Sequence, residues 1–518
     1  YPLPNEFGIG DALNIAGFRF VSATPLTWNT YIAKTDFNID AEGKHHLFVR
    51  ANLQNDRVLG TQQFPGQAAN STNLTNSKGM AIGLTSVMSP SIVNDFRYGF
   101  TRQGSESAGI ATTPLVTFRN IDSIVGSARN FRALIPVHTI ANTTTWTKGS
   151  HTVTFGTQLR GVKNDRLTNQ SSFSSASANA SWLVDSGAGL NAPFTDMLPT
   201  FRVSFRDAAT AVLGLVTQGN AQYNYLTDGT VLPDGAPVQR NFNNNEYEFF
   251  VQDSWRIKSN FTLTAGLRWS LMPPVEEENG QQLASDTPLS SWFGLRAYLM
   301  EQGRSQNEVP PISFVTNEDP RWRPLYPYHK KNFAPRLGIA YSPAFTDGFL
   351  KTLFGGPGKT SIRAGWGMFY DVFGQGILRR FDATAFGLSN SLVNPSATLT
   401  PQNAPKFSGI SAIPSGILPP APPATFPARY PDLFAITNSV DDTLVPPYSM
   451  TMNFNIARDF GKGIFVQAGY VGRLGRRLMS QTDLAMPTNI RDPQSGQTYF
   501  EAAAQTANIV NDPNFNIS

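Results

Sequence analysis

The segment Phe261-Thr262-Leu263-Thr264-Ala265-Gly266-Leu267-Arg268-Trp269 decides the fold of this chain. Successive side chains of a strand point to opposite faces of a sheet. One face therefore carries the apolar residues Phe261, Leu263, Ala265, Leu267 and Trp269. The other face carries Thr262, Thr264, Gly266 and Arg268. A strand in the wall of a membrane β-barrel has this pattern, because its apolar face contacts lipid and its polar face lines the lumen.

The same unit recurs along the chain. Residues 247–255 also alternate, and the short turn Lys258-Ser259-Asn260 joins them to the first segment. Alternation and turn residues predict about thirteen strands, with edges defined to within several residues. These strands lie near 13–22, 27–40, 44–54, 79–89, 94–103, 136–147, 151–163, 245–257, 260–271, 332–342, 360–371, 446–459 and 463–475.

The connections between these strands mostly alternate between short and long. The short ones lie at 40–44, 89–93, 148–150, 258–260 and 460–463, and the long ones at about 55–78, 104–135, 164–244, 272–331 and 372–445. Outer-membrane barrels have short periplasmic turns and long extracellular loops, so the long segments are expected to face outside. Residues 23–26 and 343–359 break the alternation. The long segments are expected to be irregular, and substrate recognition is expected there.

The composition favours a barrel over helices. Charged residues make up only 15% of the 518 residues and aromatic residues 12%, and no stretch approaches the roughly 20 apolar residues of a membrane-spanning helix. The 41 basic and 37 acidic residues are scattered, which predicts no nucleic-acid binding. The chain has no cysteine, which excludes disulfides and thiol catalysis within it. No change in composition divides it, so we predict one all-β, antiparallel transmembrane barrel domain with long extracellular loops.

Charged side chains gather on one face of the predicted strands. A lysine or arginine on the lipid side near the bilayer midplane costs about 2–4 kcal/mol, so a barrel requires this segregation. We expect these residues to line the lumen and to tune passage or hold a plug; the alternative is hydration of the wall without substrate contact. The candidates are Lys34, Asp36, Arg50, Arg97, Arg160, Glu248 and Arg268.

No motif for catalysis, cofactor binding or metal binding stands out. Residues 355–360 lack the first glycine of a phosphate-binding loop, because position 353 is Leu, and they are interpreted as a glycine-rich connection. His45 and His46 point to opposite faces of a strand, which is poor geometry for one metal ion. Residues 276–278, three glutamates, are interpreted as a solvated loop rather than a cation site. We therefore predict a protein that is not an enzyme.

Several segments, in this order and spacing, resemble the Oar-like branch of the TonB-dependent transporter family. They include Trp28-Asn29-Thr30-Tyr31, residues 48–56, Gln63-Phe64-Pro65-Gly66, residues 250–255, residues 332–338 and residues 470–477. The resemblance covers nearly the whole chain. It implies a barrel of about twenty-two strands, an N-terminal plug domain and a periplasmic box that engages TonB. Residues 1–518 are then expected to form a barrel domain that is incomplete at both ends, without the plug and the C-terminal strands.

The resemblance implies a function in the bacterial outer membrane. The expected protein is a TonB-dependent receptor that moves a bulky, unidentified extracellular substrate across that membrane. Its expected partners are outer-membrane lipid, TonB through the missing N-terminal parts, and the substrate. A surface-binding or adhesive barrel and a passive porin are the alternatives, and an envelope enzyme is the weakest one.

Overall fold

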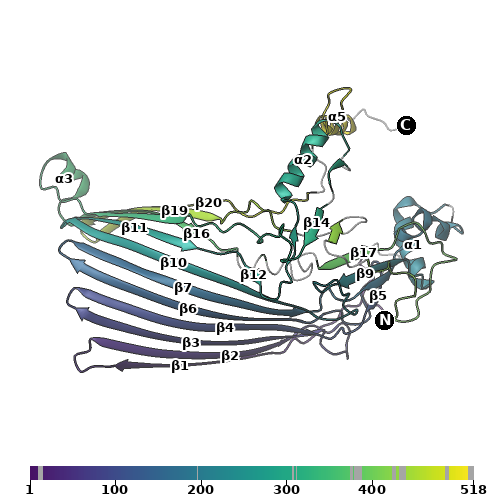
Figure 1. Ribbon diagram of the computed structural model, residues 1–518, viewed down its shortest axis with the longest axis horizontal. Coiled ribbons are helices and arrows are strands. Elements are labelled where there is room, and N and C mark those ends of the chain that lie inside the picture. Colours follow the sequence, from purple (N-terminus) through teal and green to yellow (C-terminus); the bar gives the residue numbers. More distant parts are fainter. Residues whose placement is uncertain are drawn as a thin grey trace.

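A computed structural model shows how the strands assemble. It describes residues 1–9, 16–194, 196–305, 308–310, 312–373, 377, 388–422, 428–430, 439–484 and 489–511. Twelve strands form one continuous antiparallel wall in chain order, and a short thirteenth strand, β12 (Glu276–Glu277), pairs with β10 (Figure 1). The wall strands are β1 (Leu26–Asn38), β2 (His45–Leu59), β3 (Ser71–Ser89), β4 (Ile92–Gly109), β6 (Phe131–Lys148), β7 (His151–Thr168), β10 (Val238–Lys258), β11 (Phe261–Leu271), β15 (Asn332–Tyr341), β16 (Thr360–Tyr370), β19 (Tyr448–Gly461) and β20 (Ile464–Arg476).

Twelve of the predicted strands are confirmed, and the strand at 13–22 is wrong. Residues 16–22 contain only an isolated bridge from Gly17 to Glu6, while residues 13–15 lie outside the described residues. The alternating Phe18 and Phe20 pack locally: their ring centroids lie 5.9 Å apart, and Phe18 lies 6.3 Å from Phe64. These phenylalanines therefore pack on each other and on Phe64, and their segment does not pair with a strand of the wall. The short predicted connection at 23–26 is consequently not a hairpin.

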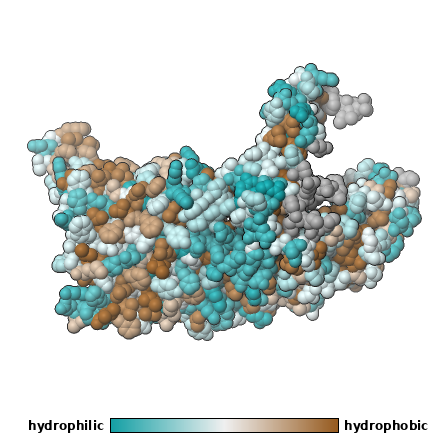
Figure 2. All heavy atoms as spheres, viewed as in Figure 1, coloured by the Kyte–Doolittle hydropathy of each residue, from teal (hydrophilic) through white to brown (hydrophobic). Residues whose placement is uncertain are grey.

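The predicted contrast between the two ends of the wall is confirmed. Tight turns lie at one end, on the left of Figure 1, and the long segments lie at the other. Most strands run further toward the long segments than predicted; β7 continues to Thr168 and β10 starts at Val238. The prediction follows the hydrophobic alternation, which is expected only where a strand contacts lipid. The hydrogen bonds between strands continue beyond that region, so the strands are longer than predicted. Figure 2 accordingly shows apolar patches over the turn end of the strands and a more hydrophilic region toward the long segments.

The long segments fold into ordered structure, contrary to the expectation that they are irregular. One lobe, defined by its four-stranded sheet, contains β5 (Leu115–Phe118), β8 (Ser175–Ala178), β9 (Gln218–Asn224) and β17 (Ser389–Val393), with 3-10 turns η1 (Ala180–Trp182) and η2 (Val184–Asn191) and helix α1 (Pro199–Val212). A second sheet contains β13 (Ala284–Ser285), β14 (Ile312–Val315) and β18 (Ala428–Tyr430). Helices α2 (Leu289–Glu301) and α5 (Tyr499–Val510) complete this end.

The four-stranded lobe has its own core, made from several loops. Val116, Ala176, Val216 and Ile417 are buried together, although each comes from a different part of the sequence. No single loop carries enough apolar surface to fold alone, because isolated short strands are at best marginally stable in water. Sequence alternation within one loop therefore could not reveal the lobe. None of the helices in the described part of the chain is long and apolar enough to span a membrane.

Candidate lumen-facing site

The strand register defines two faces of the wall. Phe249 lies opposite Trp269 and Val251 opposite Leu267, so these apolar side chains share one face, here called the apolar face. The opposite face is called the polar face. Cross-strand pairing places all seven sequence candidates on it: Lys34, Asp36, Arg50, Arg97, Arg160, Glu248 and Arg268.

Three of the candidates form ion pairs within a single strand. Lys34 Nζ lies 2.8 Å from Asp36 Oδ1 in β1. In β4, Arg97 Nε lies 2.7 Å from Asp95 Oδ1, and the Thr85 hydroxyl of β3 donates a hydrogen bond of 3.2 Å to the same carboxylate. Residues two apart point to the same face of a strand, so these pairs form without leaving the polar face.

A second group of charges links three neighbouring strands. Arg160 Nη1 of β7 lies 3.0 Å from Glu246 Oε2 of β10. Glu248, two residues along β10, accepts from Arg268 Nη1 of β11 at 2.5 Å and from the Ser270 hydroxyl at 3.1 Å. Charge-assisted hydrogen bonds of this kind are stronger than neutral ones. The group therefore fixes side-chain positions across β7, β10 and β11.

Aromatic rings on the polar face lie against glycines of neighbouring strands. A Cβ atom at Gly83 would collide with the ring of Phe48, and one at Gly156 would come within 2.9 Å of the Phe250 ring. Lys34 Nζ lies over the Phe48 ring, 5.6 Å from its centre. Each glycine thus makes room for a ring that lies flat on the wall and supports a cation.

A cation lies near the ring of a polar-face phenylalanine at two more places along the wall. Arg268 lies 5.1 Å from the centre of the Phe250 ring. Arg336 lies 4.5 Å from the centre of the Phe369 ring, which a Cβ atom at Gly367 would approach within 3.2 Å. Stacking on a ring restricts the positions that each guanidinium group can take on the wall.

Several arginines of the polar face, among them Arg50 and Arg336, form no salt bridge with a carboxylate within the part of the chain that the structure describes. Arg50 lies opposite Lys34, whose charge is already paired with Asp36. A guanidinium group stays protonated in proteins. These two positions therefore carry positive charge that is not held in a salt bridge and that can attract an anionic group.

Sequence reasoning missed three charged residues of this site, namely Asp95, Glu246 and Arg336. Asp95 and Glu246 lie two positions from the candidates Arg97 and Glu248, so alternation alone could have found them. Arg336 lies inside a predicted strand, but its stacking on Phe369 depends on the register between β15 and β16. That register is set by tertiary structure and is not visible in the sequence.

A histidine–aspartate pair lies on the apolar face, contrary to the prediction that charged residues occupy one face only. His151 Nδ1 lies 2.7 Å from Asp253 Oδ2, and the His151 ring stacks on Trp255 with ring centres 5.2 Å apart. Asp253 lies opposite Ala265 and Val153, both on the apolar face. The pair is next to a tight turn, where aromatic and polar groups meet the lipid headgroups.

The motifs judged unlikely to carry chemistry have structural roles. The carboxylate of Glu277 accepts hydrogen bonds from the backbone N–H groups of Asn241, Asn279 and Gln281 at 2.7–2.9 Å, and Glu278 pairs with Lys163. No group of three or more acidic, histidine or cysteine residues among the described ones could hold a metal ion.

The glycine-rich segment before β16 is a turn. Gly355, Gly356 and Gly358 have positive φ angles of 81°, 89° and 72°, and the ammonium group of Lys359 lies 2.7 Å from Asp459. A left-handed backbone of this kind favours glycine. The interpretation of 355–360 as a connection is confirmed.

The outer lobes contain a buried carboxylate. Asp207 of α1 is only 4% exposed; it accepts a 2.7 Å hydrogen bond from the Asn120 amide, and Arg119 lies 3.7 Å away. Burial raises the pKa of the Asp207 carboxyl. The carboxylate joins α1 to the segment after β5, so its role is to hold the lobe together.

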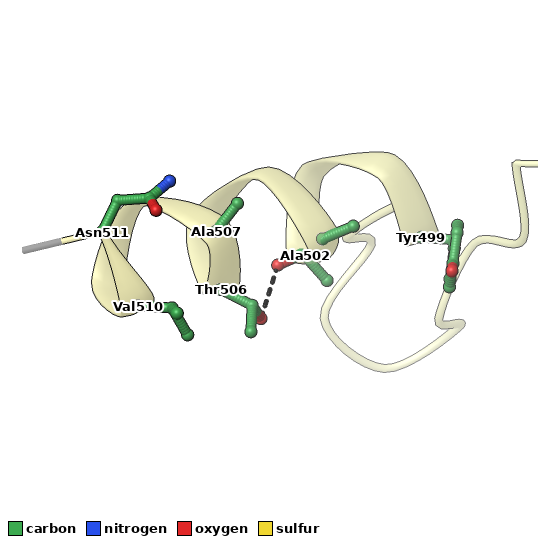
Figure 3. A pocket seen from close by; sticks show the side chains of 7 residues that line it. Tyr499, Ala502, Thr506, Ala507, Val510 and Asn511 are labelled. Atoms are coloured by element: carbon green, nitrogen blue, oxygen red, sulfur yellow. Dashed lines mark hydrogen bonds between the residues drawn. The ribbon is translucent and has the colours of Figure 1, made fainter. Parts of the chain in front are cut away.

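Helix α5 carries a shallow open groove. Figure 3 shows it lined by Tyr499, Ala502, Thr506, Ala507, Val510 and Asn511, with the Thr506 hydroxyl donating to the Ala502 carbonyl at 2.9 Å. None of its lining residues is charged.

Comparisons with known proteins agree with a β-barrel. A family model described as an outer membrane beta barrel domain matches residues 1–516. The chain belongs to this family. The barrel is therefore an outer-membrane protein of a bacterium, with antiparallel strands crossing the membrane. No curated protein matches the chain.

Solved structures with a similar barrel include three transporters or receptors. The outer membrane transporter YddB from Escherichia coli is 12% identical, with a TM-score of 0.40; the match covers 86% of this chain and 40% of that one. The ferripyoverdine receptor of Pseudomonas aeruginosa is 11% identical, with a TM-score of 0.37, covering 91% and 50%. The RagAB peptide transporter is 8% identical, with a TM-score of 0.39, covering 87% and 40%. The matches thus span between two fifths and half of those chains.

Proposed function

We propose that this barrel is the wall of a TonB-dependent outer-membrane transporter of the Oar-like type, which takes up a bulky extracellular substrate. The observation that carries the proposal is the placement of Arg50 and Arg336, two positive charges that are not held in a salt bridge among the described residues, on a polar face below folded outer lobes. The lobes would capture the substrate. The polar face would then contact it, or the plug, through these arginines and the paired charges beside them.

The proposal includes a larger barrel than the described strands form. Within the described residues, no strand pairs with the outer edge of β1 or of β20. An unpaired strand edge cannot remain in lipid, because each unsatisfied backbone group there costs several kcal/mol. We therefore place residues 1–518 within a barrel of about twenty-two strands that also holds a plug domain, with TonB engaging a segment before the plug.

The proposal assigns no catalytic role, cofactor or nucleic-acid partner to the chain. Several charged side chains of the polar face pair with one another or stack on rings, and others such as Arg50 do neither, an arrangement suited to binding and guiding a solute. A passive porin would use the same polar face without a plug. A surface-binding barrel would use the outer lobes alone, and their folded cores favour it over the porin as the second candidate.

The experiment that tests the proposal uses the full-length protein. Purified protein in detergent is titrated with the purified periplasmic domain of TonB, and binding is followed by calorimetry. The proposal predicts saturable binding that is lost when the segment preceding the plug is deleted. If the full-length protein did not bind the TonB domain and gave a steady ionic current in planar bilayers, the proposal would be contradicted and a porin favoured.

A further inference from the structure

The turn end of the wall carries one helix where the other connections are tight turns. Helix α3 (Gly348–Phe354) lies in the connection between β15 and β16, and Figure 1 shows it projecting beyond the ends of the strands. This is the segment 343–359 that breaks the predicted alternation of short and long connections. Its seven residues are more than a turn requires, so they call for a role of their own.

Three apolar side chains of α3 are exposed and form a stripe on the helix. Phe349 is 77% exposed, Leu350 42% and Leu353 47%. Leu353 follows Phe349 by four residues and Leu350 by three, and side chains at these spacings are neighbours on a helix, so the three form one surface. Lys351 lies on the other side. Phe354 is not part of the stripe, because its ring packs on Phe345 with centres 5.9 Å apart.

Contacts with the wall show on which side α3 lies. The guanidinium of Arg458 binds the carbonyl oxygens of Thr352, at 3.0 Å, and of Leu353, while the Thr360 hydroxyl donates to the Phe354 carbonyl at 2.6 Å. Arg458 thus binds the last carbonyls of the helix, where positive charge is favourable.

Arg458 and Thr360 both belong to the apolar face of the wall. Thr360 lies opposite Arg458, and Arg458 lies opposite the exposed Val466. One step further from the turn, Ile362 lies opposite Ile456 on the same face. The C-terminal end of the helix is therefore bound to the lipid-contacting side of the barrel, next to the ends of the strands.

We propose that α3 is an interfacial anchor whose stripe of Phe349, Leu350 and Leu353 inserts among the phospholipids of the periplasmic leaflet. Short amphipathic segments lie in the plane of the membrane with apolar side chains at the boundary between headgroups and acyl chains. Lys351 then points toward the headgroups and periplasmic water, where a lysine can extend its ammonium group. The anchor fixes the depth and tilt of β15, β16 and β19 in the membrane.

The experiment measures the membrane depth of single positions on α3. Full-length protein in a background without other cysteines carries Phe349→Cys, Leu353→Cys or, as the matched control on the opposite side of the same helix, Lys351→Cys. Each is labelled with an environment-sensitive fluorophore in phospholipid vesicles. Heat-modifiable migration on a gel shows that each variant keeps a folded barrel.

The proposal predicts blue-shifted emission at 349 and 353, with strong quenching by brominated lipids and little by iodide, and the reverse at 351. The sides of a helix lie about 10 Å apart, which depth-dependent quenching resolves. Equal quenching by iodide at all three positions would overturn the proposal. So would probes at 349 and 353 that are shielded in cells but exposed to water in vesicles, because a periplasmic protein would then cover the stripe.

Discussion

At the scale of single residues, the polar face repeats one arrangement of a glycine, a phenylalanine ring and a cation. A glycine on one strand makes room for a phenylalanine ring, and a cation lies over the ring, as at Gly83, Phe48 and Lys34. Glycine has a low intrinsic preference for β-strands, and an aromatic ring packed over it compensates for this weakness. Alternation in the sequence could place Phe48 on the polar face. It could not identify Gly83 as its neighbour, because that depends on the register of β2 and β3.

Adding a methyl group at Gly83 tests this arrangement. The variant Gly83→Ala is expected to displace the Phe48 ring and to destabilise the barrel by about 1–3 kcal/mol, the usual cost of overpacking. Urea unfolding of the full-length protein in vesicles, followed by tryptophan fluorescence, measures the change.

The matched control is Gly99→Ala, where the new methyl would meet nothing closer than 4.0 Å. Gly99 lies on the same face, opposite Ala81. We expect this variant to unfold close to the parent protein. Equal destabilisation by both substitutions would show that loss of glycine itself, and not contact with Phe48, is responsible.

At the scale of elements, the sequence predicts the wall well and the outer lobes poorly. Strand β11 alternates strictly between lipid and lumen, so its pattern alone is sufficient. Strands β5 and β8 are four residues each, are parallel to one another, and are buried by residues from distant loops. No local period marks such strands. Likewise, α1 lies within a segment that was expected to be an irregular loop.

The buried Asp207 predicts that the stability of the lobe depends on pH. Its pKa is raised in the folded lobe, so folding favours the protonated form. The contribution is fully present below the unfolded pKa of about 3.9 and is lost as the pH rises through the raised folded value. Hydrogen exchange of α1 is therefore expected to accelerate as the pH increases across this window, after correction for the intrinsic rate.

The variant Asp207→Asn serves as the control, because asparagine keeps the size and an acceptor for Asn120 but does not titrate. Its corrected exchange in α1 should not vary with pH in the same window. A pH dependence that persists in Asp207→Asn would assign the effect to another group.

At the scale of the whole molecule, segregation of side chains onto two faces accounts for the barrel. The sequence predicts this segregation because period-two alternation is local, and the family match agrees with it. Of the candidate site, the sequence identifies the charged residues but not their pairing. Arg160 and Glu246 are 86 positions apart and meet only because β7 and β10 are neighbours in the wall.

The central claim is that the wall crosses the outer membrane with its lobes outside and its tight turns in the periplasm. Single cysteines at Thr200 in α1 and at Glu42 in the turn between β1 and β2, both exposed, test it directly by labelling with a membrane-impermeant maleimide. Intact cells should label Thr200→Cys and leave Glu42→Cys unlabelled until the outer membrane is permeabilised. Labelling of Glu42→Cys in intact cells, with Thr200→Cys protected, would contradict the account.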